Sequence, residues 1–135
     1  MNEFVRQAAL TDGNVRGIEL LASALDWPCY VVDLRDCVDK AGLMEQVAGT
    51  LMFPSWFGHN WDALFDCLVD LASARRASGC IVVLRHLDGL RKHAPEVLDT
   101  ALGIFADAAK AWQSRGVAMR ILVEAGSQPP ASAAT

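Results

Sequence analysis

Three aspartates at intervals of four residues stand out in the segment SWFGHNWDALFDCLVD, which spans residues 55–70. On a helix, Asp62, Asp66 and Asp70 would lie along one flank, where like charges repel by about 0.2–0.5 kcal/mol per pair. Such a row could supply an enzyme with acid–base groups, together with His59, if burial shifted their pKa values. Kept in water, the same row would instead offer negative charge to a basic partner.

The aromatic residues directly before the aspartates favour the second interpretation. Trp56 and Phe57 lie between Ser55 and Gly58, in a turn that we expect to be exposed. Aromatic side chains beside charges of one sign are typical of protein-binding surfaces. For the aspartates alone, an ordinary solvated face is the alternative. The turn and the aspartates together predict a binding surface for a strongly basic partner.

An enzymatic function is the weaker hypothesis. The aspartates point away from the apolar side of the predicted helix, and no other motif supplies a nucleophile, a metal site or a phosphate-binding loop. We expect His86 and His93 in loops or at the surface, and Cys67 facing inward beside Leu68. We therefore predict a protein that is not an enzyme and that has no cofactor and no metal.

Composition narrows the class of protein. A chain of 135 residues with 53% hydrophobic and 21% charged residues is typical of one globular domain. The net charge of −4 and the pI of about 5.2 argue against direct nucleic-acid binding. The start, MNEFVRQAAL, lacks a signal-peptide pattern, and no apolar run approaches the roughly 20 residues of a membrane span. We expect a cytoplasmic protein with no membrane contact and with its four cysteines as reduced thiols.

The elements that must position the aspartates follow from hydrophobic patterning. Three nearly continuous apolar runs, at 29–34, 80–85 and 117–123, predict strands of a parallel sheet covered on both faces. The long crossovers between them predict helices over 39–51, from Asn60 to about 75, and over 95–113. Asn60 is a favourable N-cap. The apolar stripe of the second of these helices should face the core: it comprises Trp61, Leu64, Phe65 and Leu68.

The two ends of the chain are less informative. Residues 1–28 form an N-terminal extension with a candidate edge strand near 4–10 and an amphipathic helix near 15–25. This extension could cover a sheet edge or form a dimer contact. Residues 125–135, AGSQPPASAAT, have the composition of a flexible tail.

The segment FPSWFGHNWDALFDCLVDL resembles the signature region of the barstar family, intracellular inhibitors of barnase-type ribonucleases. The shared features are an aromatic pair, Gly58, Asn60, the run DAL at 62–64, an aromatic residue at 65 and the run DCL at 66–68. The resemblance implies an α/β fold over residues 29–124, with a three-stranded parallel sheet in the order 1-2-3 packed with helices.

The resemblance also implies roles for individual residues. Asp66 would occupy the site of a substrate phosphate in the ribonuclease, with Asp62 as a second acid on the same face. Trp56 stands where the family has a tyrosine that stacks on the enzyme, and Asp107 matches an acidic residue that touches it. The predicted function is inhibition of a basic ribonuclease by occlusion of its active site. The predicted partner-binding residues are Trp56, Phe57, Gly58, His59, Asn60, Asp62, Asp66, Asp70 and Asp107.

The chain departs from the family pattern at the rim of this surface. His59 replaces an acid, and Val69, Asp70 and Leu71 replace a threonine, a glycine and a tryptophan. These changes keep the acidic helix and leave the identity of the target open. A barstar-fold interaction module with a partner that is not a ribonuclease is therefore the alternative function.

Overall fold

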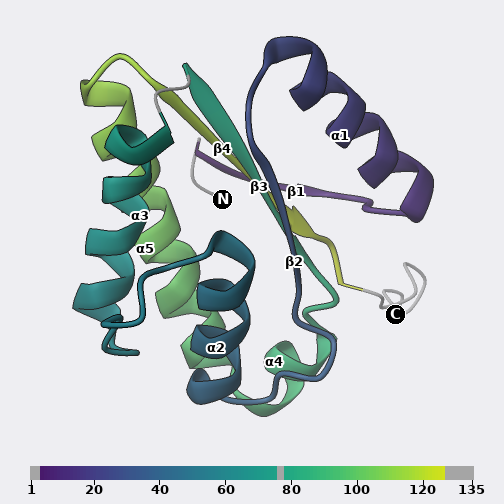
Figure 1. Cartoon of the computed structure of the whole chain (residues 1–135). Coiled ribbons are helices and arrows are strands. Elements are labelled where there is room, and N and C mark those ends of the chain that lie inside the picture. The colour runs from purple at the N-terminus through teal and green to yellow at the C-terminus, as the bar shows by residue number, and fades with distance from the viewer. Residues whose placement is uncertain (1–3, 76–77, 127–135) are drawn as a thin grey trace.

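A computed structural model of the chain shows a twisted parallel sheet with helices on both faces (Figure 1). It describes residues 4–75 and 78–126, with the backbone alone at 72–75. The elements are β1 (Val5–Ala8), α1 (Asp12–Leu25), β2 (Cys29–Asp33), α2 (Lys40–Leu51), α3 (Trp61–Arg75), β3 (Gly79–Arg85), α4 (Asp88–His93), α5 (Pro95–Ser114) and β4 (Ala118–Glu124).

The sheet has four strands in the order β1-β4-β3-β2, where the sequence predicted three. The three predicted strands are β2, β3 and β4, and they lie in the expected order with parallel pairing. The additional strand is β1 at the edge of the sheet. It pairs with β4 from Val5 opposite Ile121 to Ala8 opposite Glu124. Part of the N-terminal extension therefore lengthens the sheet beyond β4.

Two hydrophobic clusters lie on opposite faces of the sheet. The larger one, which includes Val82 and Leu84 of β3, is covered by α2, α3 and α5. The smaller one, which includes Ile81 and Val83, is covered by α1 (Figure 1). Burial from both sides explains why β3 is a continuous apolar run rather than an alternating one.

The helices agree closely with the predicted ranges. α5 begins at Pro95 as expected, and α4 precedes it as one further short helix. His93 is the exposed last residue of α4, whereas half-buried His86 lies 2.8 Å, through Nε2, from Nη2 of Arg35. Both histidines therefore lie where they were expected, His86 in the loop after β3 and His93 at the surface.

The remaining predictions concern thiols, membrane helices and the tail. All four cysteines are free; Cys37, Cys67 and Cys80 are buried and Cys29 is half-buried. Among the described residues, no helix has the length and apolar character to cross a membrane. The predicted tail at 125–135 lies outside the described residues from 127 onward.

Candidate protein-binding site

The turn before α3 points its two aromatic residues in opposite directions. The amide of Phe57 donates to the carbonyl of Pro54 at 2.9 Å, which closes the turn. Phe57 is only 5% exposed and packs edge-on against Phe53, with ring centroids 5.1 Å apart. The expectation that Phe57 is exposed is therefore wrong, because its ring turns inward onto the main core. Trp56 points outward and is 69% exposed, as expected.

The turn is fastened to the first turn of α3. Asn60 Oδ1 accepts a hydrogen bond from the amide of Ala63 at 2.8 Å, which confirms the predicted N-cap. His59 adopts a left-handed backbone conformation, φ 54°, and its Nδ1 lies 3.2 Å from the carbonyl oxygen of Phe57. A Cβ added at Gly58 would lie 3.0 Å from Asn60 Nδ2, so a larger residue there would push on the cap. Trp56 is thus presented in a fixed position relative to α3.

α3 packs on the core through a narrow apolar face. Leu64 and Leu68 are fully buried, and Cys67 is 3% exposed. The indole Nε1 of Trp112, on α5, donates to the carbonyl of Leu68 at 2.9 Å and ties the two helices together. The predicted apolar stripe is only partly correct, since Trp61 and Phe65 are half-buried at its border.

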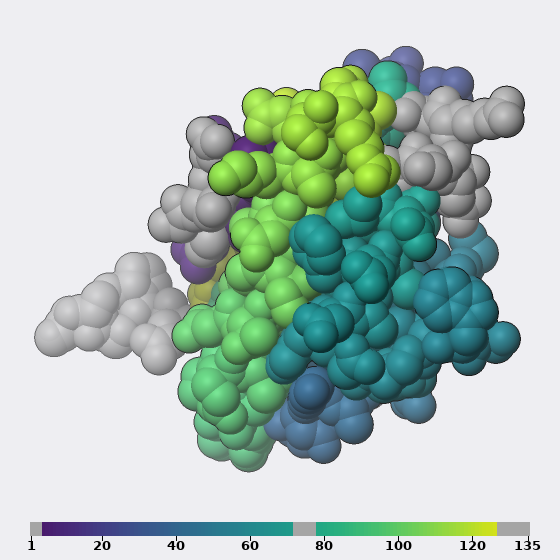
Figure 2. All heavy atoms as spheres, turned by 90° about the vertical axis from the view of Figure 1, so that its left-hand side faces the viewer, coloured from purple at the N-terminus to yellow at the C-terminus, as the bar shows by residue number. Residues whose placement is uncertain are grey.

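The acidic residues of this surface are exposed. Asp62, Asp66 and Asp70 stand outward from α3, and Asp107 stands outward from α5. Within the described part of the chain, none of these four carboxylates forms an ion pair or a hydrogen bond. Figure 2 shows α3, in teal, beside α5, in green, on one face of the molecule. The carboxylates are therefore free to interact with groups from outside the protein.

The structure divides the acids between two hollows on opposite sides of α3. The acidic hollow, about 510 Å³, lies between α3 and α5 and is lined by Trp61, Asp62, Phe65, Asp66, Ile104 and Asp107. The aromatic hollow, about 300 Å³, lies between α3 and the turn after α2 and is lined by Met52, Phe53, Pro54, Trp56, Cys67, Asp70 and Leu71.

The acidic hollow brings together three of the predicted site residues. Asp62 and Asp66 meet Asp107 there, although Asp107 lies far away in the sequence. Trp61 and Phe65 are half-buried because one side of each ring lines this hollow. Ile104 was missed by sequence reasoning, and its position three residues before Asp107 on one helix was the available clue. Asp70 is separated from this group.

The chemistry available at this surface is recognition of cations. Exposed carboxylates accept charge-assisted hydrogen bonds from arginine and lysine, which are stronger than bonds between neutral groups. Burial, followed by the charges of Asp70 and Asp66, raises the pKa of the Cys67 thiol, so this cysteine is protonated and a poor nucleophile. Among the described residues, no group of three or more His, Cys, Asp or Glu side chains could hold a metal ion.

The fold and these hollows define a small α/β protein with an acidic, hollowed surface on one face. The chain belongs to the barstar family: the family model Barstar, described as barstar (barnase inhibitor), matches residues 27–124. No curated protein matches the chain significantly. The matched region contains both hollows and begins after α1, so β1 and α1 lie outside it.

Proposed function

We propose that this protein is an intracellular inhibitor of a basic, barnase-type ribonuclease and that it occludes the active site of that enzyme. The observation that carries this proposal is the acidic hollow, where Asp62, Asp66 and Asp107 stand in solvent without partners among the residues that the structure describes. A ribonuclease must hold the phosphates of RNA with cationic side chains. Carboxylates on a rigid pair of helices can occupy the same positions through charge-assisted hydrogen bonds.

Asp66 is the central residue in this mechanism. It lies one helical turn from both Asp62 and Asp70, and it lines the acidic hollow. The cap at Asn60 and the bond from Trp112 to Leu68 hold α3 in place, so little order has to be gained on binding. The role of Asp66 is to take the place of a substrate phosphate among the cations of the enzyme.

The turn before α3 would form the part of the interface next to the acids. Trp56 offers a large exposed aromatic surface, and Gly58, His59 and Asn60 form the exposed edge between it and the acids. Phe57 is buried and would contribute indirectly, by holding the turn in position. The partner-binding role of these residues is part of the proposal. No cofactor or metal takes part in it, and its place of action is the cytoplasm.

The direct test is inhibition of a purified barnase-type ribonuclease, followed by hydrolysis of RNA. Stoichiometric inhibition by the wild-type protein, weakened strongly by Asp66→Asn, is the expected result. Asp99→Asn is the matched control, because Asp99 is an exposed aspartate of α5 that lines neither hollow. Equal inhibition by the wild type and by Asp66→Asn would remove the acidic hollow from the mechanism.

The alternative is an interaction module of the barstar fold whose basic partner is not a ribonuclease. Asp70, which replaces a glycine of the family pattern, favours it, because this residue changes the chemistry of the aromatic hollow. A small, secreted, basic nuclease encoded by the neighbouring gene would argue for the inhibitor. Affinity capture of a basic protein without nuclease activity, lost with Asp66→Asn, would argue for the alternative.

A further inference from the structure

We propose that the aromatic hollow is a specificity pocket for one arginine side chain of the partner protein. This inference rests on the proposed function in one respect, namely that the partner is a basic protein. It adds a second point of contact, on the opposite side of α3 from the acidic hollow. Asp70 and Trp56 are the residues that select the arginine.

The size of the aromatic hollow suits a single side chain. Its volume of about 300 Å³ is at the lower limit of ligand-binding pockets, which span about 300–1,000 Å³. Phe53, Cys67 and Leu71 provide apolar walls. The methylene groups of a long basic side chain can bury against such walls while the charged end stays near the opening.

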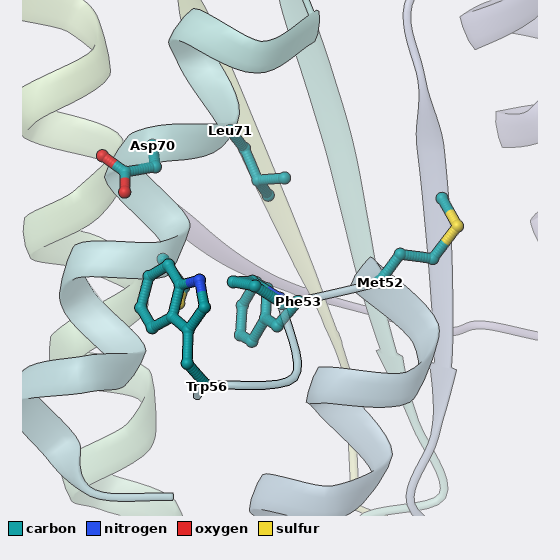
Figure 3. A pocket seen from close by; sticks show the side chains of 7 residues that line it. Met52, Phe53, Trp56, Asp70 and Leu71 are labelled. Carbon is teal, nitrogen blue, oxygen red and sulfur yellow. The ribbon is translucent and has the colours of Figure 1, made fainter. Parts of the chain in front are cut away.

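The opening carries the two groups that a guanidinium requires. Figure 3 shows Asp70 and Trp56 on the same side of the pocket, with the Asp70 carboxylate directed away from Leu71 and Phe53 toward the outside. A guanidinium is planar, so it can stack on an indole while donating two parallel hydrogen bonds to a carboxylate. The opening of the pocket therefore carries both a stacking surface and an anion.

The indole of Trp56 is open to such a contact. On the other side of α3, Lys40 Nζ lies 4.9 Å from the ring centroid of Trp61, which shows that a cation can cover an indole of this protein. No cation and no other ring stacks on Trp56 within the described residues. The exposure of Trp56, 69%, and of Met52, 64%, leaves an apolar rim that a partner would cover.

Other occupants fit this pocket less well. An apolar side chain would remove water from the Asp70 carboxylate without giving it a partner, which is unfavourable. A lysine would satisfy the charge but would lack the flat surface that stacks on the indole. A nucleic acid would be repelled by Asp70 and by the acids on the far side of α3.

The pocket is formed before any partner binds. Met52 ends α2 in a left-handed conformation, φ 57°, and its amide bonds to the carbonyl of Ala48. The amide of Phe53 donates a hydrogen bond to the same carbonyl at 3.0 Å, and the ring of Phe53 makes the edge-on contact with Phe57. Preformed walls reduce the cost of ordering on binding and sharpen selection by shape.

The test uses N-acetyl-arginine amide as the probe, titrated into the isotope-labelled full-length protein and followed by NMR. We expect saturable shifts of the Trp56 indole N–H and of the amides of Asp70 and Leu71. Asp70→Asn should weaken binding about two- to fivefold, the effect of an exposed ion pair. Asp99→Asn, which removes an equal charge elsewhere, should leave binding unchanged.

Two related probes complete the experiment. N-acetyl-lysine amide should bind more weakly than the arginine probe, and N-acetyl-norleucine amide, which has no charge, more weakly still. Equal binding of the norleucine and arginine probes would overturn the proposal in favour of an apolar pocket. Equal weakening by Asp70→Asn and Asp99→Asn would overturn it in favour of unspecific attraction by net charge.

The outcome is independent of the ribonuclease assay. Arginine binding at Trp56 that depends on Asp70, in a protein that inhibits no ribonuclease, would support the pocket and refute the proposed function. Inhibition that depends on Asp66, without any arginine binding at Trp56, would support the function and refute the pocket.

Discussion

The two sides of α3 carry carboxylates in opposite settings. On the side of α5, the acidic hollow gathers Asp62, Asp66 and Asp107 around three apolar side chains. On the side of the turn, the lining of the aromatic hollow includes one acidic residue among those that the structure describes, Asp70, together with an exposed indole and apolar walls. Several like charges on one face act at a distance and attract any basic partner. A single charge in a shaped apolar pocket acts at contact and selects among partners.

The largest expected effect concerns the support shared by the turn and the aromatic hollow. Phe57→Ala removes a ring that is 5% exposed and packed on Phe53, so we expect a loss of stability of about 3–5 kcal/mol. Trp56→Ala removes a ring of similar size that is 69% exposed, so its stability should change little. Chemical denaturation of both variants measures the difference. Similar losses would mean that the turn positions both rings alike.

The next effect separates the two hollows in binding. Asp66→Ala should weaken binding to the cognate nuclease by about 2–5 kcal/mol, the range for truncating one member of a desolvated charge pair. Asp70→Ala should cost at most about 1 kcal/mol, because its partner stays near the rim. Inhibition titrations of both variants give the two values. Equal losses, or none, would remove Asp66 from the centre of the interface.

The salt dependence of the association rate should also depend more on the acidic hollow than on the aromatic hollow. Electrostatic steering raises association rates by about 10- to 1,000-fold, and added salt screens it. The double variant Asp62→Asn, Asp66→Asn should therefore flatten the salt dependence of the rate more than Asp70→Asn does. Stopped-flow mixing at low and physiological ionic strength measures these slopes. A wild-type association rate that does not change with salt concentration would exclude electrostatic steering by this face.

The cap of α3 fixes both hollows relative to each other. Asn60→Ala removes the 2.8 Å hydrogen bond that the Ala63 amide donates to Asn60 Oδ1, and it should cost about 1 kcal/mol of stability. Asn60→Asp keeps an acceptor at this site and is the matched control. Thermal unfolding of the two variants makes the comparison. An unchanged midpoint for Asn60→Ala would mean that the turn is held by its own packing alone.

Much of the fold is predictable because the strands are buried on both faces. The runs at 29–34, 80–85 and 117–123 are apolar without interruption, and they became β2, β3 and β4 with boundaries within one residue. β1 is harder, since in VRQA only Val5 is buried and the pairing partner is at the other end of the chain. The sequence indicates a candidate strand near 4–10, but local periodicity does not tell with which strand it pairs.

The site was predictable along α3 and less so around it. Helical spacing and the family pattern indicated Asp62, Asp66 and Asp70 as one exposed row, and the structure exposes all three. Spacing within one helix says nothing of the neighbouring elements that divide this row between two hollows. The inward position of Phe57 was missed for a related reason, because it depends on the gap between α2 and α3.

The smallest expected effect tests whether the row of acids carries a cost in the free protein. Asp66 has an aspartate one turn away on either side, whereas Asp70 has one only on the N-terminal side. Since neither carboxylate has an ion pair with any residue that the structure describes, substitution should relieve repulsion without breaking a bond. Relieved repulsion should therefore raise the stability of Asp66→Ala by about 0.2–0.5 kcal/mol per pair, and that of Asp70→Ala by roughly half as much in total. Both variants also gain the higher helix propensity of alanine. Thermal unfolding at low salt measures both shifts, and about 1 M salt should abolish the part due to repulsion and leave the gain in propensity. A marked loss of stability in Asp66→Ala would identify this aspartate as structural, and the acidic hollow would then no longer be a surface maintained for binding.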